Sequence, residues 1–250
     1  MQSLVFIIYI DDLADVVDCN IKMFADDTSL YVTVEDSQVS ADILNASLEN
    51  VKNWANQWLV TFNPNKTKSM LISNKKTPHP PLYFDNCVLN NVTSHKHLGL
   101  ILNSKLNWSD HIECMIRGIS KCLDVMHKLM YALDRKTLET IYFSFMRPKL
   151  EYASIVWDDC YSKEKSLLER CQLRALRIVT GGKKGTSHAE LYDETSWNTL
   201  ESRRKKNKIE FAHKIVNKNA PDYLVEILPT TVNQHNLRNN NILKQYNFRT

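Results

Sequence analysis

The chain has 250 residues, 43% of them hydrophobic and 24% charged, and a net charge of +4. These values are typical of a globular protein with a packed core and exclude a disordered chain. The six cysteines are scattered without a Cys-x-x-Cys pair, which favours reduced thiols over a zinc site or a disulfide framework. The apolar run at residues 4–10 is too short to span a bilayer, and no basic residue precedes it as in a signal peptide. We therefore expect an intracellular protein, nuclear or cytoplasmic, that is neither secreted nor membrane-spanning.

The charge is unevenly distributed along the chain. Residues 1–100 hold 7 Lys and Arg against 11 Asp and Glu, whereas residues 101–250 hold 25 against 17. Acidic side chains suit a bound cation, and a basic excess suits a polyanion such as nucleic acid. The excess is modest, so the solvated surface of an ordinary helical domain would also explain it.

The first elements are an apolar helix and a β-hairpin. Residues 3–13 predict a buried helix, and residues 21–34 predict two strands with Asp26 and Asp27 at the bend between them. Two adjacent carboxylates on a rigid turn can supply oxygen ligands to Mg²⁺. An Asp-Asp turn that faces water is the common alternative. Asp11 and Asp12 form a second acidic pair, but no clean returning strand follows them, so we assign them to a helix end.

A long helix and several short strands should follow. Residues 37–59 carry apolar side chains at helical spacing, and Ser37 or Ser40 could cap the start of this helix. We expect strands at 68–73, 82–89 and 97–102, with a proline-rich surface loop at 75–81. Lys66 lies in an Asn-Pro-Asn-Lys-Thr turn, and Leu98 and Gly99 lie in a hairpin turn. These three are either ordinary turn residues or contacts to a substrate.

From residue 109 the apolar period becomes helical. A helix from residue 109 and helices at 135–146 and 163–179 predict a small bundle, with a break at Pro148 and a stop at Gly181 and Gly182. Arg174 and Arg177 lie one turn apart on the last of these helices. A short helix near 187–192, a long one near 197–218 and a mobile Asn-rich tail at 233–241 should follow.

The sharpest basic cluster lies on the long helix near the C-terminus. It consists of Arg203, Arg204, Lys205 and Lys206. Consecutive residues on a helix spread around its circumference, so the four cannot form a single phosphate-reading face. A solvated helix surface or a nuclear import patch are the alternatives to nucleic-acid contact.

Phe-Ala-Asp-Asp at 24–27 on a hairpin resembles the catalytic palm motif of reverse transcriptases, the RNA-directed DNA polymerases, of non-LTR retrotransposons. Four further segments follow that family's order, at residues 58–73, 97–108, 141–157 and 168–181. Each motif is weak alone, but five in the right order at plausible spacings make a specific pattern. The resemblance covers nearly the whole chain.

The resemblance implies an α+β fold in three parts. Residues 1–108 would be a truncated polymerase palm, made of a β-hairpin and short antiparallel strands with helices. Residues 109–182 would be an all-α thumb-like bundle, and residues 183–250 a basic helical C-terminal extension.

The resemblance also implies a reaction. The parent enzyme transfers a nucleotide from a dNTP to a primer 3′-hydroxyl with Mg²⁺, and here Asp26 and Asp27 would hold the metal. Lys66 would lie near the triphosphate, and Leu98 and Gly99 would grip the primer. Contacts to the duplex of RNA template and DNA primer would come from Arg174, Arg177, Arg203, Arg204, Lys205 and Lys206.

The same resemblance implies that part of the enzyme is missing from this chain. In the family, a third carboxylate on an earlier palm strand and the nucleotide-covering fingers precede the motifs found here. We therefore expect a polymerase fragment that is inactive alone. The alternative is a non-catalytic nucleic-acid-binding or interaction remnant of a mobile element.

Overall fold

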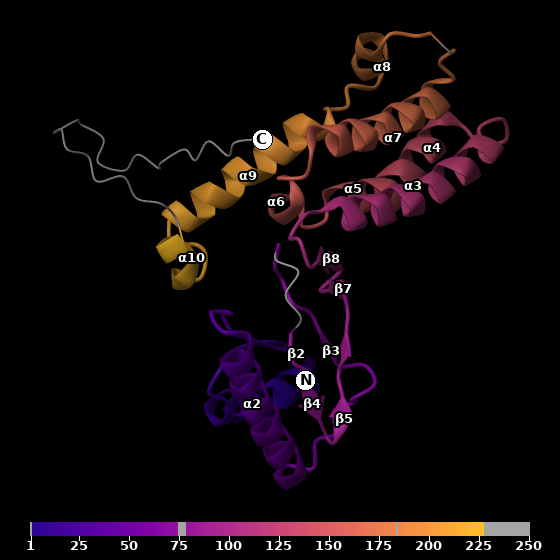
Figure 1. Cartoon of the computed structure of the whole chain (residues 1–250). Helices are drawn as coiled ribbons and strands as arrows, with labels where there is room; N and C mark the ends of the chain where they lie inside the picture. Colours follow the sequence, from indigo (N-terminus) through magenta and orange to yellow (C-terminus); the bar gives the residue numbers. More distant parts are fainter. Residues whose placement is uncertain (1, 75–78, 184, 228–250) are drawn as a thin grey trace. The chain divides into compact units, whose positions relative to one another are not determined.

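The computed structural model describes residues 2–74, 79–183 and 185–227 (Figure 1). The chain divides into two compact units, Met1–His111 and Ile112–Thr250, called here the N-terminal and C-terminal units. Helices and four separate two-stranded sheets make up the described residues, which agrees with the expected α+β class. Among these residues, no helix has the length and apolar character needed to cross a membrane. The assignment of the two units to palm and thumb stays a prediction.

The N-terminal unit is built around one long helix. Its first elements are α1 (Gln2–Tyr9), a 3₁₀ helix (Asp11–Val16), β1 (Asn20–Phe24), β2 (Asp27–Tyr31) and α2 (Ser37–Gln57). The Asp36 side chain begins α2 by accepting hydrogen bonds from the backbone amides of Gln38 and Val39, at 2.8 and 3.0 Å. Asp36, rather than Ser37 or Ser40, is therefore the N-cap, because its carboxylate satisfies amides that the first helical turn leaves open.

One face of α2 forms the core of this unit. Leu48, Val51, Trp54 and Ala55 are buried in one cluster with four other apolar residues. These are Ile10 just before the 3₁₀ helix, Leu13 within it, Phe84 of the later strand β4 and Leu89 between β5 and β6. The sequence predicts a buried first helix, but the described side chains of α1 are exposed. Val5 and Ile8 in α1 are 62% and 68% exposed, whereas Ile10 and Leu13 beyond it are buried in the core.

The rest of the N-terminal unit contains two tight hairpins and one short parallel pair of strands. Its elements are β3 (Lys68–Ser69), β4 (Tyr83–Phe84), β5 (Cys87–Val88), β6 (Asn90–Asn91), β7 (Ser94–His97) and β8 (Leu100–Asn103). β3 pairs in parallel with β6, whereas β4–β5 and β7–β8 are antiparallel hairpins. The strands expected at 82–89 and 97–102 are each interrupted by a turn. Asp85 and Asn86 have φ of 50° and 59°, and two successive positive φ values define a two-residue hairpin turn.

The C-terminal unit is all helical in its described residues. Its elements are α3 (Ser109–Leu129, which starts just before the unit boundary), α4 (Arg135–Ile141), a π-helix (Tyr142–Met146), α5 (Arg147–Glu151), α6 (Ser154–Trp157), α7 (Ser162–Thr180), α8 (His188–Thr195), α9 (Leu200–Val216) and α10 (Asp222–Ile227). The expected loop at 75–81 lies partly outside the described residues, and the Asn-rich segment 233–241 lies wholly outside them.

The expected helix break at Pro148 is wrong. The helix that starts at Arg135 continues through the π-helix into α5, and Pro148 lies in the first turn of α5. The amide of Arg147 bonds to the carbonyl of Tyr142, which is the wider spacing of a π turn. A proline in the first helical turn loses no intrahelical hydrogen bond that the helix needs. The chain therefore passes Pro148 without leaving the bundle.

α7 is the central helix of the bundle. It packs against α4, α8 and α9, and its Leu173 and Leu176 are buried with Leu191 of α8. The apolar stripe expected on α3 is confirmed, because Ile112, Ile119, Leu123 and Met126 are all buried. At the end of α7, Gly181 adopts a left-handed conformation with φ of 67°, which confirms the expected stop.

Two glycines of this unit should respond in opposite ways to alanine. Gly118 lies inside α3, and a methyl group added at either Gly118 or Gly181 meets no atom within 4 Å. Gly118→Ala should stabilise the protein by about 0.5–1 kcal/mol, because glycine is a poor helix former. Gly181→Ala should destabilise it by about 1–2 kcal/mol, because its φ is left-handed. Urea unfolding followed by circular dichroism measures both, and shifts of the same sign would contradict this account.

Candidate functional site

The hairpin with the acidic pair is confirmed. β1 and β2 pair antiparallel, with Phe24 opposite Asp27, so that Ala25 and Asp26 form the turn. Ala25 has a φ of 52°, as this tight turn requires. Asp26 and Asp27 are both exposed. The turn therefore presents two adjacent carboxylates to solvent.

The chemistry of this donor pair fits part of a magnesium site. Carboxylate oxygens are the ligands that Mg²⁺ takes, usually one or two of them together with water and substrate phosphates. A site for two metal ions needs more ligands than one turn provides. Within the described ranges, no group of three or more His, Cys, Asp or Glu side chains is placed to hold a metal ion. Asp26 and Asp27 could thus be two ligands of a larger set, and that role stays a prediction.

The other acidic pair has a structural contact. Asp12 accepts a hydrogen bond from the indole nitrogen of Trp54 at 3.0 Å, and Asp11 and Asp12 open the 3₁₀ helix. The contact joins this short helix to α2. The expected position at the end of the apolar helix is therefore wrong in detail, because α1 ends at Tyr9 and the two acids open the next helix.

Lys66 projects from a turn that is fixed by Asn63. The Asn63 carbonyl accepts hydrogen bonds from the amides of Lys66 and Thr67, both at 3.1 Å, and the Asn63 side chain accepts one from the amide of Asn65 at 3.0 Å. Lys66 itself is exposed. A lysine on a rigid, exposed turn can neutralise phosphate charge, and its place near a triphosphate stays a prediction.

Leu98 and Gly99 form the turn between β7 and β8. Their φ values are 46° and 84°, so both residues are left-handed, as a two-residue hairpin turn of this type requires. Gly99 adopts this conformation freely, whereas for Leu98 it costs about 1–2 kcal/mol. Strained backbone of this kind often marks a functional position. The primer-grip role of this turn stays a prediction.

Arg174 and Arg177 lie on α7 at the surface of the bundle. Arg174 is exposed and donates a hydrogen bond to Asp124 of α3 at 2.8 Å, and Arg177 is half-buried. Both line an open hollow between the C-terminal ends of α3 and α7. The two arginines predicted to contact nucleic acid therefore face the same hollow.

The basic cluster on α9 is divided between core and surface. Arg203 and Arg204 are 8% and 2% exposed, while Lys205 and Lys206 are exposed. A guanidinium buried inside a bundle is not available to a phosphate. Arg203 and Arg204 therefore cannot make the predicted nucleic-acid contacts. Contacts from Lys205 and Lys206 stay a prediction.

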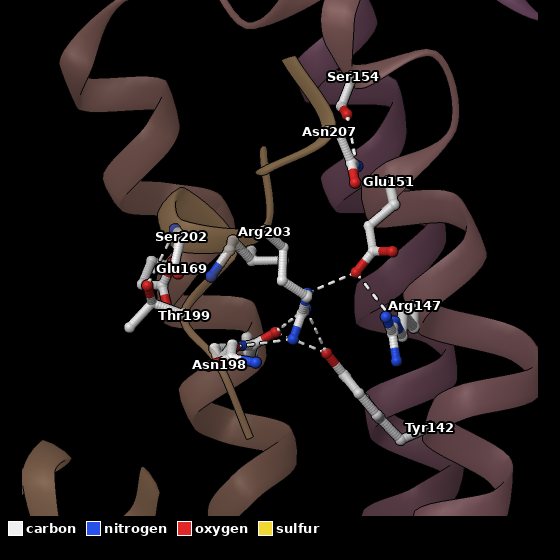
Figure 2. A network of polar contacts seen from close by, with 12 residues as sticks. Tyr142, Arg147, Glu151, Ser154, Glu169, Asn198, Thr199, Ser202, Arg203 and Asn207 are labelled. Carbon is white, nitrogen blue, oxygen red and sulfur yellow. Dashed lines mark hydrogen bonds and ion pairs between the residues drawn. The ribbon is translucent and has the colours of Figure 1, made fainter. Parts of the chain in front are cut away.

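Arg203 is the centre of a buried polar network (Figure 2). Its guanidinium donates to the carbonyl of Asn198 at 2.7 Å, to the Gln172 side chain at 2.5 Å and to the Tyr142 hydroxyl at 3.1 Å. Its Nε also forms an ion pair with the Glu151 carboxylate at 2.5 Å, but the geometry of this contact is not that of a hydrogen bond. Burial, the leading cause, raises the pKa of Tyr142, which donates to Gln172 at 2.6 Å. The network joins α9 to α5 and α7.

Arg204 forms a second network around Asp158. Its Nε donates to Asp158 at 2.7 Å, and Lys208 approaches the other oxygen of that carboxylate at 2.6 Å. Lys165 of α7 lies 3.7 Å away. Burial alone would raise the pKa of Asp158, but the hydrogen bond and charge of Lys208, with Lys165 and Arg204, lower it below its ordinary value of 3.8.

The sequence analysis missed these structural arginines, although a signal for them was present. Leu200, Arg204, Phe211 and Ile215 recur at helical spacing, so Arg204 falls on the apolar stripe of α9. A charged residue on such a stripe indicates a buried ion pair rather than a solvated face.

The chain is similar in sequence to RNA-directed DNA polymerases of transposable elements, and the resemblance to non-LTR reverse transcriptases is confirmed. It is 25% identical over 166 residues to a probable RNA-directed DNA polymerase from transposon BS of Drosophila melanogaster. It is 21% identical over 161 residues to the probable enzyme from transposon X-element of the same species, and 24% identical over 164 residues to the enzyme from mobile element jockey of Drosophila funebris.

These alignments cover 63%, 63% and 64% of this chain but only 18% of each relative. The aligned part of the chain thus spans less than a fifth of the length of the relatives that it matches. No family model and no solved structure matches the chain.

The neighbouring residues of α9 provide a matched test of burial. Arg203→Ala or Arg204→Ala should lower the free energy of unfolding by about 1–3 kcal/mol, because each removes buried hydrogen bonds and one of the cations that face Glu151 or Asp158. Lys205→Ala and Lys206→Ala should change it by no more than about 0.5 kcal/mol. Urea unfolding of the four variants tests this, and equal effects at buried and exposed positions would contradict the structure.

Asp158 should make stability depend on pH. Because its pKa is lower in the folded than in the unfolded chain, its contribution is fully present above pH 3.8 and is lost as the pH falls through the folded value. Asp158→Asn should lower the melting temperature near neutral pH, and the gap to the parent chain should narrow below pH 3.8. Thermal melts between about pH 2 and 7 measure this. A gap that stays constant across this range would show that the charge of Asp158 does not contribute.

Proposed function

We propose that this chain supplies the palm hairpin and the thumb of a retrotransposon RNA-directed DNA polymerase and does not extend a primer alone. The observation that carries the proposal is the Phe-Ala-Asp-Asp hairpin, in which the turn presents Asp26 and Asp27 to solvent. The sequence similarity to polymerases of mobile elements supports the same conclusion.

In this proposal each candidate residue has a distinct task. Asp26 is the main ligand of Mg²⁺ and Asp27 its partner, and the bound ion would neutralise the phosphate oxygens of a dNTP. Lys66, exposed on its rigid turn, neutralises departing pyrophosphate. The turn at Leu98 and Gly99 lets backbone approach the primer end, because Gly99 has no side chain in the way.

A second candidate function is nucleic-acid binding without chemistry. It is favoured by the small donor set at the hairpin, where the described residues offer Asp26 and Asp27 but no third acidic or imidazole ligand beside them. Arg174, Lys205 and Lys206 remain exposed whether or not the hairpin is active. Under this function the C-terminal unit still binds the duplex of RNA template and DNA primer.

A primer–template assay distinguishes the two candidate functions from each other and from the absence of both. The purified chain with Mg²⁺ and dNTPs should give no primer extension, because two carboxylates from one turn cannot clamp two ions. It should bind the duplex weakly, with affinity falling steeply between about 50 and 200 mM salt as phosphate contacts release counterions. Lys205→Ala with Lys206→Ala should flatten the salt dependence more than Lys136→Ala with Lys163→Ala, which also removes two exposed charges.

Two outcomes would overturn the proposal. Template-directed extension that Asp26→Ala abolishes would show that the chain is a complete enzyme. Absence of duplex binding at about 50 mM salt, where electrostatic contacts are strongest, would remove the nucleic-acid function.

A further inference from the structure

The hollow between the ends of α3 and α7 combines an aromatic ring with two cations. Its volume is ≈ 650 Å³, and its lining includes Met130 and Tyr131 just after α3, and Arg174, Arg177 and Ile178 on α7. Pockets for small organic ligands typically measure about 300–1,000 Å³, so the hollow can take a group the size of a nucleotide. Both helices belong to the C-terminal unit, and the Arg174–Asp124 ion pair joins them beside the hollow.

Tyr131 is unusually exposed for an aromatic residue of a packed bundle. It is 88% exposed, whereas Ile178 in the same lining is 4% exposed. Its ring therefore contributes little to the core and is open to a ligand. An exposed aromatic ring stacks well on a nucleic-acid base, because every base has an open π-face when it is unpaired.

The positive charge of the hollow comes from its side chains. α3 and α7 both end here, and helix C-termini carry partial negative charge that repels an anion. Arg174 and Arg177 are the permanently charged cations of the lining and attract a phosphate against this field. Arginine suits this task because its planar fork donates to two phosphate oxygens at once.

Asp124 competes with a phosphate for Arg174. The pair has a separation of 2.8 Å, but the two side chains are 48% and 60% exposed. Exposed ion pairs add little to stability, so a phosphate can replace Asp124 as the partner of Arg174 at small cost. Removing the charge of Asp124 should then favour an anionic ligand.

We propose that this hollow binds an unpaired nucleotide of a single strand. The base stacks on Tyr131, and the flanking phosphates pair with Arg174 and Arg177. A duplex is a poorer occupant, because its bases already stack on their neighbours and cannot offer a face to Tyr131. An acidic peptide would use the arginines but would gain nothing from the aromatic ring. The inference rests on the proposed nucleic-acid function and adds a preference for unpaired strand.

The test measures, by fluorescence anisotropy, how tightly the full chain binds a labelled oligothymidylate of about twelve nucleotides. The oligonucleotide is offered once as a single strand and once annealed to its complement. Tyr131→Ala should weaken single-strand binding about fivefold or more, as expected for the loss of one stacked base. It should leave duplex binding unchanged. Tyr131→Trp should retain single-strand binding, because the indole also stacks. Phe145→Ala, at a site that is 62% exposed and outside the hollow, is the matched control and should have no effect.

Substitutions of the two arginines and of Asp124 provide an independent test of the same proposal. Arg174→Ala with Arg177→Ala should weaken single-strand binding and reduce its salt dependence, whereas Asp124→Asn should strengthen it. The proposal fails if Tyr131→Ala and Phe145→Ala behave alike, if Asp124→Asn weakens binding, or if polyglutamate competes as well as the oligonucleotide does. Binding of duplex but not of single strand would refute the hollow and leave the proposed function standing. Binding of neither would refute both.

Discussion

The constraint on which the C-terminal unit depends is the burial of two arginines of α9. Each guanidinium loses its water on folding, and only a carboxylate with further hydrogen bonds can offset that loss. Arg203 meets Glu151, and Arg204 meets Asp158. These two contacts fix α9 against α5 and the end of α6, and the hydrogen bond from Arg203 to Gln172 fixes it against α7. The stacking of Tyr142 on Trp197, with ring centroids 4.0 Å apart, then falls beside the same network.

This arrangement separates the residues that stabilise the bundle from those that can bind a ligand. The arginines of α9 point inward, so Lys205 and Lys206 point outward on the same helix. At the shared end of α3 and α7, Arg174 remains at the surface with a weak partner. In the N-terminal unit, Trp54 and Asp12 hold α2 and the 3₁₀ helix together, while Asp26 and Asp27 remain exposed. The surface groups could therefore change without loss of the fold.

Local sequence signals predicted the hairpin at 21–34, the long helix α2 and the glycine stop of α7, because each depends on nearby residues. Expectations failed where the outcome depends on distant partners. The break at Pro148 was wrong because a π turn precedes it. Arg203 and Arg204 resembled surface cations because their acidic partners lie 46 or more residues away. The strand near 82–89 was predicted without its turn at Asp85 and Asn86, because non-glycine residues at positive φ carry little signal, whereas the turn at Leu98 and Gly99 was expected.

The central claim is that the turn at Asp26 and Asp27 holds a divalent cation. Titration of the ¹⁵N-labelled chain with Mn²⁺, which replaces Mg²⁺ and broadens nearby amide signals, measures this at each residue. The account predicts broadening centred on residues 24–28 that excess Mg²⁺ reverses and that Asp26→Asn with Asp27→Asn removes. Asp11 and Asp12 provide an internal comparison, since they are also adjacent acids but open the 3₁₀ helix. Broadening at Asp11 and Asp12 alone, or no broadening at the hairpin, would contradict the account.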